Sequence, residues 1–71
     1  MNRVPVSSSN LAAVGYDPAG KVLEIEFLNG SIYQYFNVPN HIYTGLMAAG
    51  SHGSYFDAYI KQGGYHYRKI R

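Results

Sequence analysis

A short glycine-containing loop at residues 51 to 54, reading Ser-His-Gly-Ser, leads directly into a predicted helix. Free backbone N–H groups and the positive end of a helix dipole suit a phosphate group. Ser51, Gly53 and Ser54 are therefore candidate phosphate contacts. The ordinary alternative is a connection between two helices, in which Gly53 permits the bend and Ser54 caps the second helix. The loop is not a P-loop, because no lysine follows its glycine.

The tail from residue 65 interleaves aromatic and cationic residues in the order Tyr-His-Tyr-Arg-Lys. Aromatic rings can stack on unpaired bases and cations can contact phosphates, as in proteins that bind single-stranded nucleic acid. The candidate contacts are Lys61, Arg68 and Lys69 for phosphates and Tyr55 or Tyr67 for bases. The alternative is that Tyr65 and Tyr67 pack on a sheet while the charges keep the chain end hydrated.

Catalysis and metal binding are not indicated by the polar residues. The three histidines, at positions 41, 52 and 66, match no metal-ligand spacing, and the chain has no cysteine. No nucleophile, base and orienting acid occur in a recognised order. The net charge is only +2, but the last eleven residues hold four cations and no acid, which suggests a basic end that could meet a polyanion. We therefore expect a non-catalytic module with no metal and no cofactor.

The stretch from Leu23 to Phe36 is expected to form the centre of a sheet. Its first run, LEIEF, alternates apolar residues with glutamates, as a half-buried strand requires. The two runs of this stretch meet at Asn29-Gly30, which is a strong signal for a hairpin.

The register of this hairpin decides whether Tyr33 and Tyr35 belong to the core. A two-residue turn puts both tyrosines on the face of the glutamates and buries Gln34. A three-residue turn, Leu28-Asn29-Gly30, puts the tyrosines on the core face and Gln34 beside the glutamates. Because an unpaired buried amide is costly, we favour the three-residue turn, which makes an exposed stacking platform of these two tyrosines less favoured.

A further strand is predicted from Leu11 to Tyr16. The sequence Asp17-Pro18-Ala19-Gly20 has type I turn preferences and would join it to the next strand. The three strands then form an antiparallel meander, and the alternating residues 65 to 71 are compatible with a short C-terminal edge strand. A sheet of this size needs a layer over its apolar face.

Two short helices can supply that layer. The first is predicted from Pro39 to about Ala49, where Gly45 indicates either a weak helix or a close approach to another backbone. The second is predicted to begin at Ser54, since Asp57 follows at the spacing of a capping box, and to end at the two glycines 63 and 64.

Residues 1 to 10 are predicted to be a flexible N-terminal arm, because Pro5 lacks a backbone donor and the Ser-Ser-Ser-Asn cluster at 7 to 10 favours turns. Residues 11 to 71 are predicted to form a single domain. The sequence has neither an apolar run of signal-peptide length nor a stretch that could span a bilayer. With no cysteine, a cytoplasmic location and no membrane association are expected.

A family resemblance extends over most of the chain, from about Ser7 to Ile70. It is carried by Ser9-Asn10, Gly15-Tyr16, LEIEF at 23 to 27, Gly30, Tyr33-Gln34-Tyr35, Val38-Pro39, Ser51 with Gly53, Tyr55-Phe56, Ile60-Lys61 and Tyr67-Arg68. Together these residues resemble the KTSC domain, a family named for its place at the C-terminus of some lysyl-tRNA synthetases and also found as small stand-alone proteins. Its central motif, Tyr33 and Tyr35 with the following Val-Pro, is fairly specific. The sequence departs from the family pattern at residues 57 to 59 and at residues 62 to 64. The association of the family with lysyl-tRNA synthetases implies that the domain binds RNA.

The fold expected from the sequence is therefore α+β: a three-stranded antiparallel meander packed on one face by two short helices. The leading functional hypothesis is a monomeric, non-catalytic module that binds RNA or single-stranded nucleic acid. The alternative is a protein-interaction module that uses the open edge of the sheet or its tyrosine-rich surface.

Overall fold

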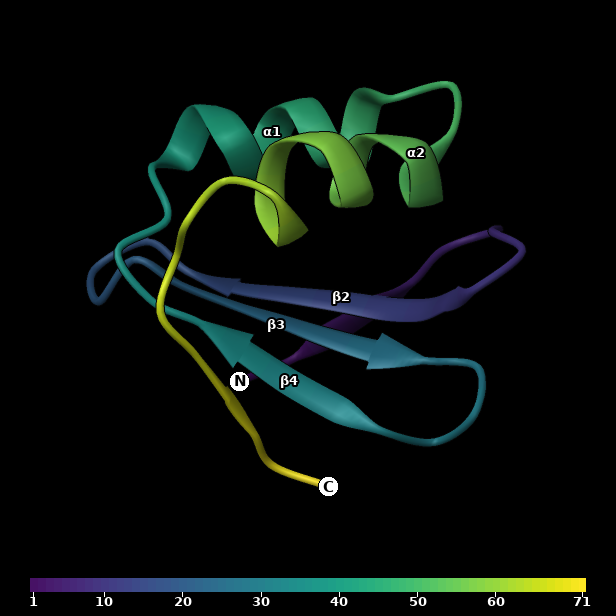
Figure 1. Cartoon of the computed structure of the whole chain (residues 1–71), viewed down its shortest axis with the longest axis horizontal. Helices are drawn as coiled ribbons and strands as arrows, with labels where there is room; N and C mark the ends of the chain where they lie inside the picture. Colours follow the sequence, from purple (N-terminus) through teal and green to yellow (C-terminus); the bar gives the residue numbers. More distant parts are fainter.

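A computed structural model describes residues 1–71, and its elements follow one another as a single sheet with two helical segments over one face (Figure 1). The strands are β1 (Arg3–Pro5), β2 (Leu11–Asp17), β3 (Val22–Phe27), β4 (Ile32–Tyr35) and β5 (Tyr67–Lys69). The helical segments are α1 (Asn40–Ala48), α2 (His52–Phe56) and the π-helical segment η1 (Asp57–Lys61), which continues α2. None of these helices is long and apolar enough to cross a membrane.

The sheet has five antiparallel strands in the order β1-β2-β3-β4-β5, so the predicted α+β class is confirmed and the predicted number of strands is too low. The C-terminal edge strand is confirmed as β5. The other additional strand, β1, lies within the predicted N-terminal arm and pairs with β2. The prediction of an arm is therefore wrong for residues 3 to 5. Pro5 is tolerated there because β1 is an edge strand, where a missing backbone donor need not break the ladder.

The β3–β4 hairpin adopts the predicted three-residue turn. Ile25 pairs with Tyr33 and Leu23 pairs with Tyr35, while Gly30 has the positive φ of 92° that this turn requires. Gln34 lies opposite Glu24 and its Nε2 donates to Glu24 Oε1 at 2.8 Å. The prediction of this register, which was based on the cost of burying the Gln34 amide without a partner, is therefore confirmed.

Helix α1 follows Pro39 and ends one residue before the predicted end. Gly45, in its middle, faces the ring of Tyr55: a Cβ atom at this position would overlap the Tyr55 hydroxyl group. The close approach expected at Gly45 therefore comes from a side chain of the second helix and not from a backbone. Absence of a side chain at this position lets the two helices pack together.

The N-cap of helix α2 lies three residues earlier than predicted, so the prediction that Ser54 caps it is wrong. The N-cap is Ser51, whose Oγ accepts a hydrogen bond from Ser54 N at 3.3 Å. Asp57, the predicted partner of Ser54, instead accepts a hydrogen bond from Gln62 Nε2 at 3.1 Å. The helix ends before the two glycines, as predicted, and Gly64 adopts a positive φ of 80°.

The hydrophobic core lies between the sheet and the helices. It consists of Leu11, Val14, Leu23, Ile25, Tyr35, Val38, Leu46, Phe56 and Ile60. Tyr35 is only 6% exposed, and Tyr33 is partly buried against the same cluster. The prediction that both tyrosines face the core is confirmed.

The opposite face of the sheet carries a network of ion pairs. The guanidinium of Arg3 in β1 donates to Glu24 and, at 3.1 Å, to Glu26. Arg71 approaches the other carboxylate oxygen of Glu26 at 3.9 Å. Burial alone would raise the pKa of Glu24, but hydrogen bonds from Gln34 and Arg3 and the charge of Arg3 outweigh it, so this pKa is lower than 4.5.

Because the Glu24 pKa is lower in the folded state than in the unfolded state, ionised Glu24 stabilises the fold above the unfolded value. This contribution is lost as the pH falls below about 4.5 through the folded pKa. We therefore expect the melting temperature of the wild type to exceed that of Glu24→Gln at pH 6, and the difference to shrink toward pH 3. Melting curves followed by circular dichroism measure this. A difference that does not change between pH 6 and pH 3 would contradict the assignment.

Candidate functional site

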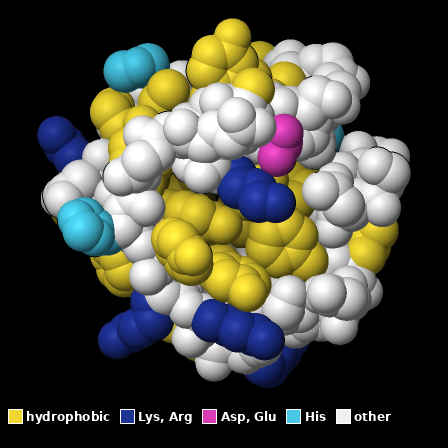
Figure 2. All heavy atoms as spheres, viewed as in Figure 1, with side chains coloured by type: hydrophobic (Ala, Val, Ile, Leu, Met, Phe, Trp, Pro, Cys, Tyr) yellow, Lys and Arg dark blue, Asp and Glu magenta, His cyan; other side chains and the backbone are white.

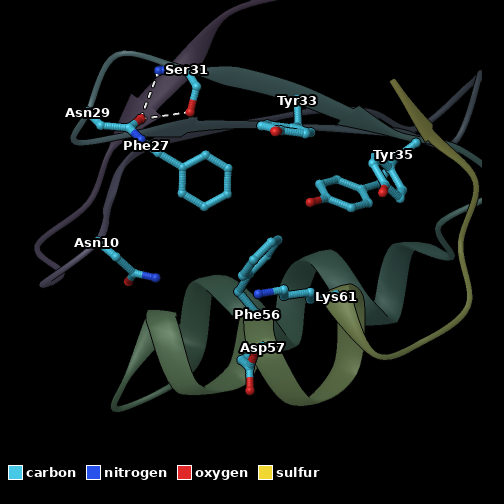
Figure 3. A pocket seen from close by; sticks show the side chains of 10 residues that line it. Asn10, Phe27, Asn29, Ser31, Tyr33, Tyr35, Phe56, Asp57 and Lys61 are labelled. Carbon is cyan, nitrogen blue, oxygen red and sulfur yellow. Dashed lines mark hydrogen bonds between the residues drawn. The ribbon is translucent and has the colours of Figure 1, made fainter. Parts of the chain in front are cut away.

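A cleft of about 500 Å³ lies between the C-terminal half of the sheet and the α2–η1 segment (Figure 3). Its apolar lining consists of Phe27, Tyr33, Tyr35, Phe56 and Tyr67, and its polar lining of Asn10, Asn29, Ser31, Asp57 and Lys61. Figure 2 shows hydrophobic side chains gathered in a hollow on this face of the molecule, with cationic side chains around it. The volume falls within the range of roughly 300–1,000 Å³ that is usual for small-molecule sites.

The five aromatic side chains of the cleft form one connected cluster. Phe56 contacts Phe27 and Tyr35 edge to face, with ring centroids 5.5 and 5.6 Å apart. Tyr67 lies tilted over Tyr33 and Tyr35 at 6.0 and 5.6 Å. Tyr67 is nevertheless 63% exposed, so it offers ring surface to a ligand.

The sheet register explains why these rings meet. Tyr35 pairs with Tyr67 across β4 and β5, and side chains that are paired in register lie on the same face. Tyr33, two residues before Tyr35, shares that face. Helix α2 covers it and contributes Phe56, which is 3% exposed.

The charged groups at the edge of the cleft are not paired with each other. Lys61 takes part in none of the ion pairs of the structure, and its side chain extends toward the cleft in Figure 3. Asp57 is bonded to Gln62 instead and lies on the outer side of the helix in the same view. Lys61 is therefore available to an anionic ligand.

Burial raises the pKa of Tyr35 to about 12, with smaller contributions from Tyr33 and Tyr67. The Tyr35 hydroxyl group is therefore protonated at neutral pH. It can donate a hydrogen bond, but it is a poor candidate for a general base.

Two carboxamide groups line the hairpin end of the cleft. The Asn29 Oδ1 atom accepts hydrogen bonds from Ser31 N at 3.0 Å and Ser31 Oγ at 2.7 Å. The Asn10 Oδ1 atom accepts one from Ser8 Oγ at 3.0 Å. In both side chains the oxygen is occupied and the amide nitrogen has no partner within the protein.

Of the predicted site residues, Lys61 and Tyr67 line the cleft. Lys69 pairs with Tyr33 and so lies on the cleft side of β5. Arg68 pairs with Gln34 and lies on the opposite face, with the ion pairs. The three predicted phosphate-binding cations are therefore divided between two faces of the sheet.

The other four predicted residues do not line the cleft. Ser51 and Ser54 bond to each other at the start of α2. Gly53 packs against Asn10, and Tyr55 packs against Gly45 and lies 4.6 Å from the ring of Tyr59. These four residues are engaged in contacts within the protein. Gly53 and Ser54 belong to helix α2 itself and Ser51 caps it, so Gly53 does not form the bend and Ser54 does not form the cap that the alternative interpretation expected.

Sequence reasoning missed six of the cleft residues, namely Asn10, Phe27, Asn29, Ser31, Phe56 and Asp57. Phe27 lies in a predicted strand, Phe56 in the second predicted helix and Asn29 in the predicted hairpin turn. No local signal indicated that these three regions converge on one cleft. No three of the histidine, aspartate and glutamate side chains lie together in a cluster that could hold a metal ion.

The fold and the cleft define a small α+β domain, in which a five-stranded meander and one layer of helices border an aromatic cleft. The family model of the KTSC domain matches residues 7–67. This chain belongs to the KTSC domain family.

Relatives at similar levels of identity include both small proteins and a segment of a larger enzyme. An uncharacterized protein of Stutzerimonas stutzeri is 40% identical over 99% of both chains. A lysine–tRNA ligase of Nostoc is 43% identical over 75% of this chain, which corresponds to 9% of the ligase. The crystal structure of a KTSC domain protein from Yersinia pestis superimposes with a TM-score of 0.90 at 44% identity, covering 99% of this chain and 97% of that one.

Proposed function

We propose that this domain is a non-catalytic module that binds single-stranded RNA, with an unpaired base in the aromatic cleft and the adjacent phosphate on Lys61. The observation that carries this function is an exposed ring, Tyr67, next to an unpaired lysine at the edge of one cleft. Base–aromatic stacking and phosphate–cation contacts are the two interactions that single-strand binding uses.

Lys61 favours an anionic ligand over a cationic one, because its side chain extends toward the cleft while the carboxylate of Asp57 is bonded to Gln62 on the outer side of the helix. A cluster of tyrosine and phenylalanine rings can also hold an alkylammonium group by cation–π contacts. Lys61 would repel such a group at the entrance. Lys69, on the same side of β5, adds a second cation for a polyanion.

Sequence similarity to two ligases supports the RNA-binding proposal independently of the cleft geometry. Two lysine–tRNA ligases from Nostoc species contain a segment similar to this chain. A ligase of that name acts on an RNA substrate. RNA is accordingly the nucleic acid to be tested first.

Removal of the Lys61 charge tests the proposal. We expect Lys61→Gln to weaken binding of a labelled single-stranded RNA and to make the salt dependence less steep by about 0.7 in the slope of log K against log[salt]. Fluorescence anisotropy at two or more salt concentrations measures both effects.

Lys21→Gln is the matched control. Lys21 lies in the β2–β3 turn, is exposed and takes no part in the cleft. Its substitution should leave the salt slope closer to that of the wild type. Absence of RNA binding by the wild type at low salt, or equal slopes for Lys61→Gln and the wild type, would refute the proposal.

A protein partner is the second candidate, because the outer edge of β5 is unpaired and all three of its residues are exposed. Cations on an edge strand oppose pairing with another strand, which makes this candidate the weaker one. Binding of a partner protein that does not change with salt would favour it.

A further inference from the structure

We propose that Asn10 and Asn29 select the base in the cleft, and that they favour bases with an exposed carbonyl oxygen, such as uracil, over adenine. This inference rests on the proposed function, since it concerns the same cleft. It is carried by the two carboxamides at the hairpin end, whose nitrogens are free donors while their oxygens are occupied.

The orientation of Asn29 is fixed by the backbone. Ser31 N can only donate, so the atom of Asn29 that it contacts at 3.0 Å must be the oxygen. A second hydrogen bond from Ser31 Oγ, at 2.7 Å, holds the same oxygen. The Asn29 Nδ2 atom is therefore presented away from the turn, on the side of Phe27 in Figure 3.

The orientation of Asn10 is set by the hydroxyl group of Ser8, which has both lone pairs engaged and so is left to donate. Ser8 Oγ accepts hydrogen bonds from the backbone N–H groups of Asn10 and Leu11 at 3.3 and 3.2 Å, and it donates its own proton to Asn10 Oδ1. Gly53 leaves room for this carboxamide, since a Cβ atom there would overlap the Asn10 oxygen. Figure 3 shows the Asn10 nitrogen directed toward the cleft.

The backbone brings these two donors to the same end of the cleft. Leu28 N donates to Asn10 O at 2.9 Å, which places Asn10 beside the hairpin turn that contains Asn29. Both residues line the cleft together with Ser31. The hairpin end therefore presents two amide donors, and the oxygens of both carboxamides are already used.

Two donors fit a base edge that offers acceptors. Uracil, like thymine, presents O4, and guanine presents O6 and N7. Adenine presents on the same edge a single acceptor, N7, next to the N6 amino group, which is a donor and opposes a second amide donor. A carbonyl oxygen such as uracil O4 has two lone pairs and can accept from both amides. Stacking alone would not produce a preference for uracil, because the larger purine ring stacks more strongly on aromatic side chains.

The experiment compares two RNA hexamers, U6 and A6, by fluorescence anisotropy at one salt concentration. We expect the wild type to bind U6 about fivefold or more tightly than A6, which is the lower end of discrimination by well-placed hydrogen bonds. Asn29→Asp keeps the oxygen that Ser31 requires and replaces the donor by an acceptor. This variant, and likewise Asn10→Asp, should reduce the U6/A6 ratio or reverse it.

Asn40→Asp is the matched control, because it adds the same charge at an exposed position outside the cleft. It should affect both hexamers equally and leave the ratio unchanged. Melting curves of the three variants establish that each is folded at the temperature of the titration. A variant that is unfolded at that temperature is titrated with both hexamers at a lower temperature, at which it is folded, and the wild type is titrated at the same lower temperature for comparison.

The outcomes separate this inference from the proposed function. If the wild type binds A6 as tightly as U6 or more tightly, or if both cleft variants keep the wild-type ratio, the base selection is wrong while the RNA-binding cleft stands. If neither hexamer binds at low salt, the proposed function fails and this inference fails with it.

Discussion

Phe56→Ala is expected to unfold a large part of the protein under conditions in which the wild type is folded. Phe56 is 3% exposed and contacts Phe27 and Tyr35 edge to face. Truncation of a buried phenylalanine costs about 3–5 kcal/mol. A domain of this size has a stability near the lower end of the usual range of about 5–15 kcal/mol, so most of it would be lost. Urea denaturation followed by circular dichroism measures the effect.

Tyr59→Ala is the control for this prediction, because it removes a ring from the same helical segment. Tyr59 is 56% exposed and is not part of the core. Its truncation should cost about 1 kcal/mol or less. Phe56→Leu, which retains most of the buried volume, should be intermediate. Similar urea midpoints for Phe56→Ala and Tyr59→Ala would show that Phe56 does not support the core as described.

Tyr67→Ala is expected to weaken RNA binding by about 1–3 kcal/mol, which corresponds to a factor of roughly 5 to 150. The reason is loss of the exposed ring over which a base would stack. Because Tyr67 is 63% exposed, the free energy of unfolding should change much less than in Phe56→Ala. Affinity measured by anisotropy and stability measured by urea denaturation separate the two effects.

Tyr67→Phe and Tyr59→Ala are the matched variants for the binding experiment. Tyr67→Phe keeps the stacking surface and should bind nearly as the wild type does. Tyr59→Ala removes an exposed ring that does not line the cleft and should leave the affinity unchanged. Wild-type affinity in Tyr67→Ala would exclude this ring as the stacking surface.

The strands nearest the centre of the sheet could be predicted because their local chemistry permits only one arrangement. Gln34 needs polar neighbours, and only the three-residue turn puts it beside Glu24. The alternation of Leu23, Ile25 and the glutamates then fixes the buried face. This information is contained within one short stretch of chain.

The helix start and the N-terminal strand could not be predicted reliably, because two local rules competed at each. Ser51 and Ser54 both have a residue three places on that could complete a cap, and only the tertiary position of the helix selects Ser51. Pro5 argues against a strand unless the strand lies at an edge, and the edge position depends on the whole sheet.

The cleft was predicted only in part for a related reason. Lys61 and Tyr67 could be predicted because a cation and an aromatic ring are residue types that bind nucleic acid. Asn10 and Phe56 have ordinary local roles in a turn and a helix, so their types alone do not indicate a site. Only the folded chain brings Asn10, Phe56 and Tyr67 to one cavity. Arg68 and Lys69 are neighbours in sequence, but strand alternation puts them on opposite faces.

The strand order has a consequence for how the protein gains and loses its structure. Strands β1 to β4 pair with their sequence neighbours through short connections, and such contacts of low contact order form readily. Strand β5 is separated from β4 by residues 36 to 66, which contain both helices, so its pairing closes a much longer loop than the other strand pairs do. We therefore expect Tyr67 to complete the cleft later than the other rings, and local opening of the exposed strand β5 would remove it from the cleft. A ligand held by Tyr67 would shift that opening equilibrium, so that occupancy of the cleft and the population of the paired state of β5 are thermodynamically linked.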